Sequence, residues 1–188
     1  MTDAIEEIIL EAEEKMSKSI EHFKEELAGF RTGKASPALV ENIRVQYYGS
    51  QVKLRELATI STPEPRLIVI NAYDPTSLPE IEKAILSANI GITPVNDGRV
   101  IRLPIPELSM ERRNELVKLA RKRAEDTRVA IRNIRRDANE HIKKLEKSKE
   151  ITEDEMELAT KQIQDNTDKF MAQIDEILSA KEKDILGS

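Results

Sequence analysis

The sequence predicts an α+β protein in which a long three-helix bundle carries an inserted small β/α/β domain. Charged residues make up 35% of the 188 residues and aromatic residues only 3%, which favours long solvated helices over a broad sheet. Apolar residues recur at helical spacing towards both ends of the chain, whereas in the middle they alternate with polar residues. The net charge of −5 is unevenly spread, because residues 111–149 hold fourteen Lys and Arg against seven Asp and Glu.

Three amphipathic helices are expected, over residues 5–30, from about 110 to 148, and from Thr152 onwards. The third begins with a capping box, in which the Thr152 side chain and the Glu155 side chain each accept from the other's backbone N–H. Ile151 and Met156 would add the hydrophobic staple. Each helix has one narrow apolar face, and the three faces can be buried together in one bundle.

The middle of the chain predicts a small domain over residues 32–106, so that the bundle comprises 1–31 and 107–188. Its expected elements are a hairpin, a short strand buried on both faces, a short helix, and a turn into a last strand. In the same order, these elements correspond to Ile43–Leu54, Leu67–Ile70, Pro79–Ala88 and Asn96-Asp97-Gly98 before Val100–Leu103.

Two short crossings would connect the small domain to the bundle, at residues 31–34 and 103–106. Gly33 permits unusual φ angles, while the prolines fix φ and disfavour helix before them. We therefore expect a narrow hinge, since motion is the default for domains joined by thin linkers. The hinge residues are Thr32, Gly33, Leu103, Pro104, Ile105 and Pro106.

Several function classes are excluded or disfavoured. The absence of Cys excludes disulfides and thiolate chemistry. His22 and His141 lack partners at metal-ligand spacing, so we expect no metal and no cofactor. Gly33-Lys34 is followed by Ala35, where a phosphate-binding loop needs Ser or Thr. No catalytic grouping is evident, so we do not expect an enzyme. No apolar run reaches 18 residues and the N-terminus is acidic, which predicts a cytoplasmic protein without membrane contact.

A row of cations follows one face of the second helix. A helical projection places its members within an arc of roughly 100°, centred about 120° from the apolar face. Such a row suits the phosphates of structured RNA, and the scarcity of aromatic residues argues against base stacking there. Pairing with the acidic neighbouring helices is the alternative interpretation for the charges, and a helical co-chaperone or scaffold is the alternative function. The row comprises Arg121, Arg128, Arg132, Arg135, Arg136 and Lys143.

Ordered motifs over essentially the whole chain resemble the ribosome recycling factors. Thr93 stands where that family often has Asn, and Lys53 where Pro is common, which affects only loop detail. The motifs are Arg31–Pro37, Tyr47-Tyr48-Gly49, Leu54–Ala58, Glu82–Ile85, Glu111-Arg112-Arg113 and Arg128–Asn139.

The resemblance implies an L-shaped monomer that binds the 70S ribosome after termination, across the A and P sites. Elongation factor G, with GTP, would then act on the smaller domain, splitting the subunits and releasing mRNA. The resemblance also implies contacts with large-subunit rRNA. We expect them first from Arg132, Arg135 and Arg136, and then from Arg128 and Arg31.

Overall fold

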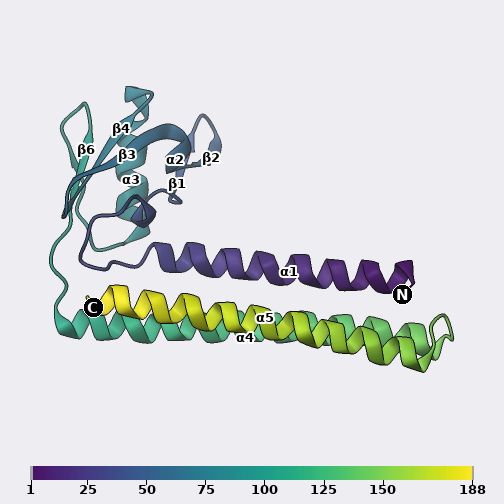
Figure 1. The fold of residues 1–188 in the computed structure, drawn as a ribbon. Coiled ribbons are helices and arrows are strands. Elements are labelled where there is room, and N and C mark those ends of the chain that lie inside the picture. The colour runs from purple at the N-terminus through teal and green to yellow at the C-terminus, as the bar shows by residue number, and fades with distance from the viewer. Residues whose placement is uncertain (1, 188) are drawn as a thin grey trace. The chain divides into compact units, whose positions relative to one another are not determined.

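The computed structural model describes residues 2–187 and has the predicted α+β architecture (Figure 1). Three long helices are present: α1 (Asp3–Ala28), α4 (Met110–Lys147) and α5 (Glu153–Leu186). The chain divides into two compact units. The first runs up to Lys24 and resumes over Lys118–Lys181, and the second comprises Glu25–Val117 and the residues from Glu182 on. The predicted domain limits, at residues 31 and 107, stay a prediction.

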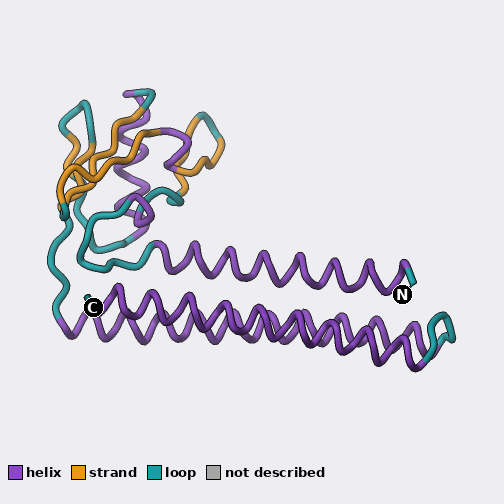
Figure 2. Tube along the Cα trace, viewed as in Figure 1, coloured by secondary structure: helices purple, strands orange, loops and turns teal. Residues whose placement is uncertain are grey.

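The first unit is the three-helix bundle, whose helices run alongside one another in Figure 2. Its core combines isoleucine with alanine, which lets the helices approach closely while filling the space between them. This confirms the predicted bundle and its apolar faces. The core residues near the N-terminal end of α1 are Ile5, Ile9, Ala12, Ala138, Ile142, Ile151, Ala159 and Ile163.

The start of α5 confirms the predicted capping box. The Thr152 N–H donates to Glu155 Oε1 at 3.1 Å, and the Glu155 N–H donates to Thr152 Oγ1 at 3.1 Å. Ile151 is buried and Met156 packs against the same core, as expected for a hydrophobic staple. The tight turn between α4 and α5 therefore has a local cause in the sequence.

The second unit contains two antiparallel sheets (Figure 1). One is the hairpin of β1 (Arg44–Tyr47) and β2 (Ser50–Lys53). The other has the strand order β3-β4-β6-β5. Its strands are β3 (Ala58–Glu64), β4 (Leu67–Ala72), β5 (Val95–Asn96) and β6 (Ile101–Pro104); the helices of this unit are α2 (Leu54–Leu57) and α3 (Leu78–Ala88), with 3₁₀ turns at Pro37–Leu39 and Pro75–Ser77.

The predicted hairpin, short helix and last strand are confirmed, but other details of this unit differ from the prediction. Leu54 starts α2 instead of extending the hairpin, and β3 was not predicted. The expectation that Leu67–Ile70 is buried on both faces was wrong. Ile68 and Ile70 are fully buried while Leu67 and Val69 are half-buried, because an antiparallel sheet covers its two faces unequally.

The predicted hinge residues lie in the second unit, and their role in motion stays a prediction. Gly33 has a φ of +85°, a left-handed conformation that favours glycine. On the second crossing, residues 103–106, which we call the return crossing, Pro104 is the last residue of β6 and pairs with Leu67. The Ile105 N–H donates to Arg66 O at 2.8 Å, so the sheet pairing extends to Ile105.

Candidate nucleic-acid interface

Helix α4 positions the predicted cations. Its buried face includes Ala120, Ala124, Ile131 and Ile142. The predicted cations follow one another at steps of one, three, four and seven residues, which keeps them together on another side of the helix. We call Arg128, Arg132, Arg135, Arg136 and Lys143 the cationic row; Arg121 precedes it on the helix.

Arg128 is bound to carboxylates at the edge of the bundle. Its side chain is only 24% exposed, and its Nη2 donates to Asp175 Oδ1 of α5 at 2.8 Å. Its Nη1 donates to Glu125 Oε2 at 3.3 Å. The hydrogen bond to Asp175 is the main cause that raises the pKa of Arg128. The expectation of a solvent-facing row therefore fails at this residue, whose charge is compensated within the bundle.

Arg132 is more open. Its side chain is 43% exposed, and its Nη1 donates to Glu125 Oε1 at 3.2 Å. The hydrogen bond from Arg132, followed by that from Arg128, lowers the pKa of the Glu125 carboxyl. The Glu125 carboxylate therefore accepts hydrogen bonds from two guanidinium groups. Its single negative charge cannot neutralise both, so part of the positive charge of Arg132 remains available to a ligand.

The remaining members of the row form an open cationic surface. Arg135 Nη1 donates to the neutral Gln164 Oε1 of α5 at 3.2 Å, and Gln164 Nε2 in turn donates to Asp168 Oδ1 at 2.8 Å. Arg136 and Lys143 are exposed, and neither forms an ion pair within residues 2–187. Guanidinium forks with free donors suit phosphate oxygens, which makes this stretch the candidate interface.

Arg31 belongs to the second unit, and its guanidinium group donates hydrogen bonds to backbone carbonyl oxygens. Its Nη1 donates to Gly91 O at 2.9 Å, and its Nη2 to Pro106 O at 3.4 Å. Burial, followed by the charge of Arg112, lowers the pKa of Arg31. Because Pro106 is in the return crossing, this side chain ties the two predicted crossings together. Its expected contact with rRNA stays a prediction, with few donors left for it.

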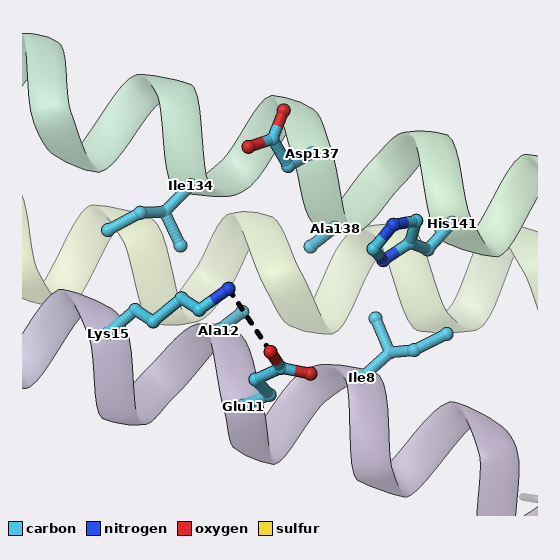
Figure 3. Close-up of a pocket in the computed structure, with 8 residues that line it drawn as sticks. All are labelled: Ile8, Glu11, Ala12, Lys15, Ile134, Asp137, Ala138 and His141. Carbon is cyan, nitrogen blue, oxygen red and sulfur yellow. Dashed lines mark ion pairs between the residues drawn. The ribbon is translucent and has the colours of Figure 1, made fainter.

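Between α1 and α4 lies a cavity of about 50 Å³, which has room for a few water molecules. In Figure 3, Lys15 and Glu11 of α1 form an ion pair of 3.1 Å, and His141 of α4 lies towards Ile8. Within residues 2–187, no group of three His, Asp or Glu side chains could hold a metal ion, and no helix is long and apolar enough to cross a membrane.

Sequence reasoning missed the partners on α5 that decide how each arginine behaves. Asp175 holds Arg128, while Gln164 contacts Arg135 without compensating its charge. The signal for them is weak, because both are exposed polar residues on a helix rich in such residues. Identifying these two residues would have required the packing register of α5 against α4.

Comparison with known proteins identifies the family. The family model described as Ribosome recycling factor matches residues 23–186. The ribosome-recycling factor of Carboxydothermus hydrogenoformans is 57% identical over 183 residues, covering 97% of this chain and 99% of that protein. The ribosome-recycling factor of Bacillus subtilis is 48% identical over 180 residues, covering 96% of this chain and 97% of that protein.

Two solved structures extend the similarity to the fold. The solution structure of a ribosome recycling factor has a TM-score of 0.78 and 45% identity, covering all of both chains. The T. thermophilus ribosome recycling factor, described together with E. coli elongation factor G on the E. coli post-termination complex, has a TM-score of 0.66 and 44% identity, covering 99% of this chain and all of that one. This chain therefore belongs to the ribosome recycling factor family, whose members are non-enzymatic translation factors.

Proposed function

We propose that this chain binds post-termination ribosomes and acts there with elongation factor G, and that the cationic row of α4 is its anchor on large-subunit rRNA. The partner assignment follows the relative described on the E. coli post-termination complex with elongation factor G. GTP turnover would belong to that factor, since this family is not enzymatic. Family membership also decides against the alternative of a helical co-chaperone or scaffold.

The observation that carries the anchor is the open half of the cationic row. Arg135 faces a neutral amide, Arg136 and Lys143 have no acidic partner within residues 2–187, and Arg132 shares one carboxylate with Arg128. A cationic surface on a straight helix can follow a phosphate backbone, and affinity then comes largely from counterion release. We rank Arg132, Arg135 and Arg136 as the main contacts, followed by Arg128 and Arg31.

The decisive experiment replaces Arg132 and Arg135 together by Ala. Each is exposed enough that folding should change by no more than about 0.5 kcal/mol. Binding to post-termination 70S ribosomes should weaken by roughly a hundredfold or more, because two charge-assisted hydrogen bonds are lost. The matched control is K161A/K169A, which removes two exposed lysines from α5 and the same charge. Unchanged binding of the Arg132/Arg135 double variant would reject the anchor.

Salt dependence gives an independent measure. For roughly five phosphate contacts, the affinity should fall by about two to three decades between 50 and 200 mM salt. The double variant should show a shallower slope than the wild type. Binding that does not respond to salt would contradict the anchor.

We further propose that the crossings at 31–34 and 103–106 act as the hinge through which the small domain responds to elongation factor G. The positive φ of Gly33 supports it, and on the second crossing Pro106 lies beyond the sheet pairing, which extends to Ile105. The hydrogen bond from Arg31 to Pro106 O would limit its range. Subunit splitting by a G33P variant, with ribosome binding as the control, tests this. Splitting at the wild-type rate would argue against a hinge at Gly33.

A further inference from the structure

The tip of the β1–β2 hairpin carries a tyrosine that the fold does not require. Tyr48 and Gly49 form a two-residue loop between the paired residues Tyr47 and Ser50. Their φ angles are +48° and +79°, as in a type I′ turn, where Asn, Asp and Gly are preferred. Tyr48 is also 84% exposed, so its ring buries little. A disfavoured backbone conformation combined with an exposed ring points to a binding role.

Neighbouring side chains support the ring. The Tyr47 and Tyr48 rings form a T-shaped pair, with centroids 4.6 Å apart and planes at 76°. The Tyr47 hydroxyl donates to Asp74 Oδ2 at 3.0 Å, which ties the hairpin tip to the loop after β4. A supported aromatic ring loses little conformational freedom when a flat ligand stacks on it.

The hairpin around this ring is cationic and rich in amide groups. Residues 42–55 contain Arg44, Lys53 and Arg55 and no Asp or Glu. The Lys53 side chain forms an ion pair with Glu25 at 3.4 Å. The Arg44 side chain is exposed and forms no ion pair or hydrogen bond within residues 2–187. Gln46 and Gln51 face each other across the strands and are exposed.

A groove of about 400 Å³ runs beside this face of the hairpin, towards α3. Arg44, Gln46 and Gln51 contribute to its lining from the hairpin, and Lys83 and Glu80 from α3. Tyr48, in the loop at the end of the hairpin, is not part of this lining, so the ring and the groove are separate contacts. A ligand that reaches both should combine negative charge, a flat ring and edges that form hydrogen bonds. An unpaired nucleotide has all three properties.

We propose that Tyr48 stacks on an unpaired base of RNA while Arg44 contacts a neighbouring phosphate. That the RNA is ribosomal rests on the proposed function. The two surfaces of the protein then differ in chemistry: the cationic row contacts phosphates without aromatic residues, and the hairpin tip binds a base. The hairpin would thus give the second unit an RNA contact of its own.

Three substitutions of Tyr48 in the full-length chain distinguish the contribution of the aromatic ring to binding from the effect of the turn conformation on stability. Y48N relaxes the turn, so its thermal midpoint should equal or exceed that of the wild type, while its affinity for post-termination 70S ribosomes falls on the order of tenfold. Y48L removes the ring but keeps the bulk, and should bind as weakly as Y48N. Y48F keeps the ring and should bind like the wild type. Wild-type affinity of Y48N, or weak binding of Y48F, would overturn the proposal.

A crosslink identifies the partner. When p-azidophenylalanine replaces Tyr48, irradiation of the ribosome complex should label rRNA; labelling confined to a protein would refute base stacking. The R132A/R135A variant separates the two hypotheses. If it loses binding while the Tyr48 variants keep full affinity, only the present inference fails. If it binds normally, the proposed anchor fails, and an RNA crosslink from position 48 would still support the hairpin contact.

Discussion

Gln164 of α5 accepts a hydrogen bond from Arg135 Nη1 at 3.2 Å, and so orients a guanidinium group without adding a negative charge beside it. The contrast with Arg128 is direct, since Arg128 reaches the Asp175 carboxylate of the same helix at 2.8 Å. Helix α5 thus compensates one end of the cationic row and leaves the other end charged. This difference gives two predictions of opposite sign.

Replacing Gln164 by Glu should weaken ribosome binding. The new carboxylate keeps the shape of the amide but compensates the charge of Arg135, as Asp175 does for Arg128. We expect affinity to fall and the salt dependence of binding to become shallower. The new carboxylate also loses the hydrogen bond to Asp168 and repels that carboxylate, which opposes any gain in folding stability from the pair with Arg135. The measurement is a binding titration at several salt concentrations.

The matched control is Q162E, which adds the same charge to α5 beside Glu6, Ile9 and Leu10 of α1. It should bind more tightly than Q164E. Equal losses in the two variants would mean that net charge matters and the contact with Arg135 does not.

Replacing Asp175 by Asn should strengthen ribosome binding. The change removes a carboxylate from the Arg128 guanidinium and leaves that charge available to phosphate. Because Asp175 is exposed, the gain should be modest, about two- to fivefold. In an R128A background the same change should have no effect, and this double-mutant cycle isolates the pair. An equal gain in both backgrounds would place the effect elsewhere.

The long elements were predictable because their signals repeat. Helices α1, α4 and α5 each show the apolar period over many turns, and Thr152 and Glu155 mark a helix start by themselves. Helix α2 is a single turn, Leu54–Leu57, and has no period to detect. Strand β3 is mostly exposed and contains Pro63, so it lacks the alternation that marks a half-buried strand.

The candidate site was predictable only in part. Projection along α4 gives the direction of each arginine, but it cannot tell which carboxylate on another helix lies within reach. Arg128 and Arg135 share a face of α4, yet one meets Asp175 and the other Gln164, roughly three helical turns apart on α5. The packing register of the two helices decides that outcome.

The capping box of α5 predicts a purely structural variant. T152A removes the acceptor for the Glu155 N–H and should lower the free energy of unfolding by about 1 kcal/mol. T152S keeps a hydroxyl and should lose much less. Urea unfolding of both variants measures the difference. Ribosome affinity of T152A should match the wild type, and a large loss of binding would show that the end of the bundle contributes to the interface.

The turn before β6 predicts a loss of stability in acid. Asp97 Oδ1 accepts from the Arg99 and Val100 N–H groups, each at 2.9 Å, and Oδ2 accepts from Arg102. The hydrogen bond from Val100 is the main cause that holds the pKa of Asp97 well below its ordinary value, followed by those from Arg99 and Arg102. The folded state therefore favours the ionised carboxyl, so its stabilising contribution is complete above the unfolded pKa, near 4, and is lost as the pH falls towards the folded pKa.

The test compares wild type with D97A by urea unfolding at pH 6 and at pH 2.5. The wild type should be clearly more stable than D97A at pH 6. The difference between the two proteins should shrink at pH 2.5, because protonation weakens the hydrogen bonds to the Asp97 carboxylate that the substitution deletes. R102A is the companion variant, which deletes one donor to Asp97 and keeps both backbone bonds, so it should retain most of the pH dependence. A difference between wild type and D97A that is the same at both pH values would show that the Asp97 charge does not stabilise this turn.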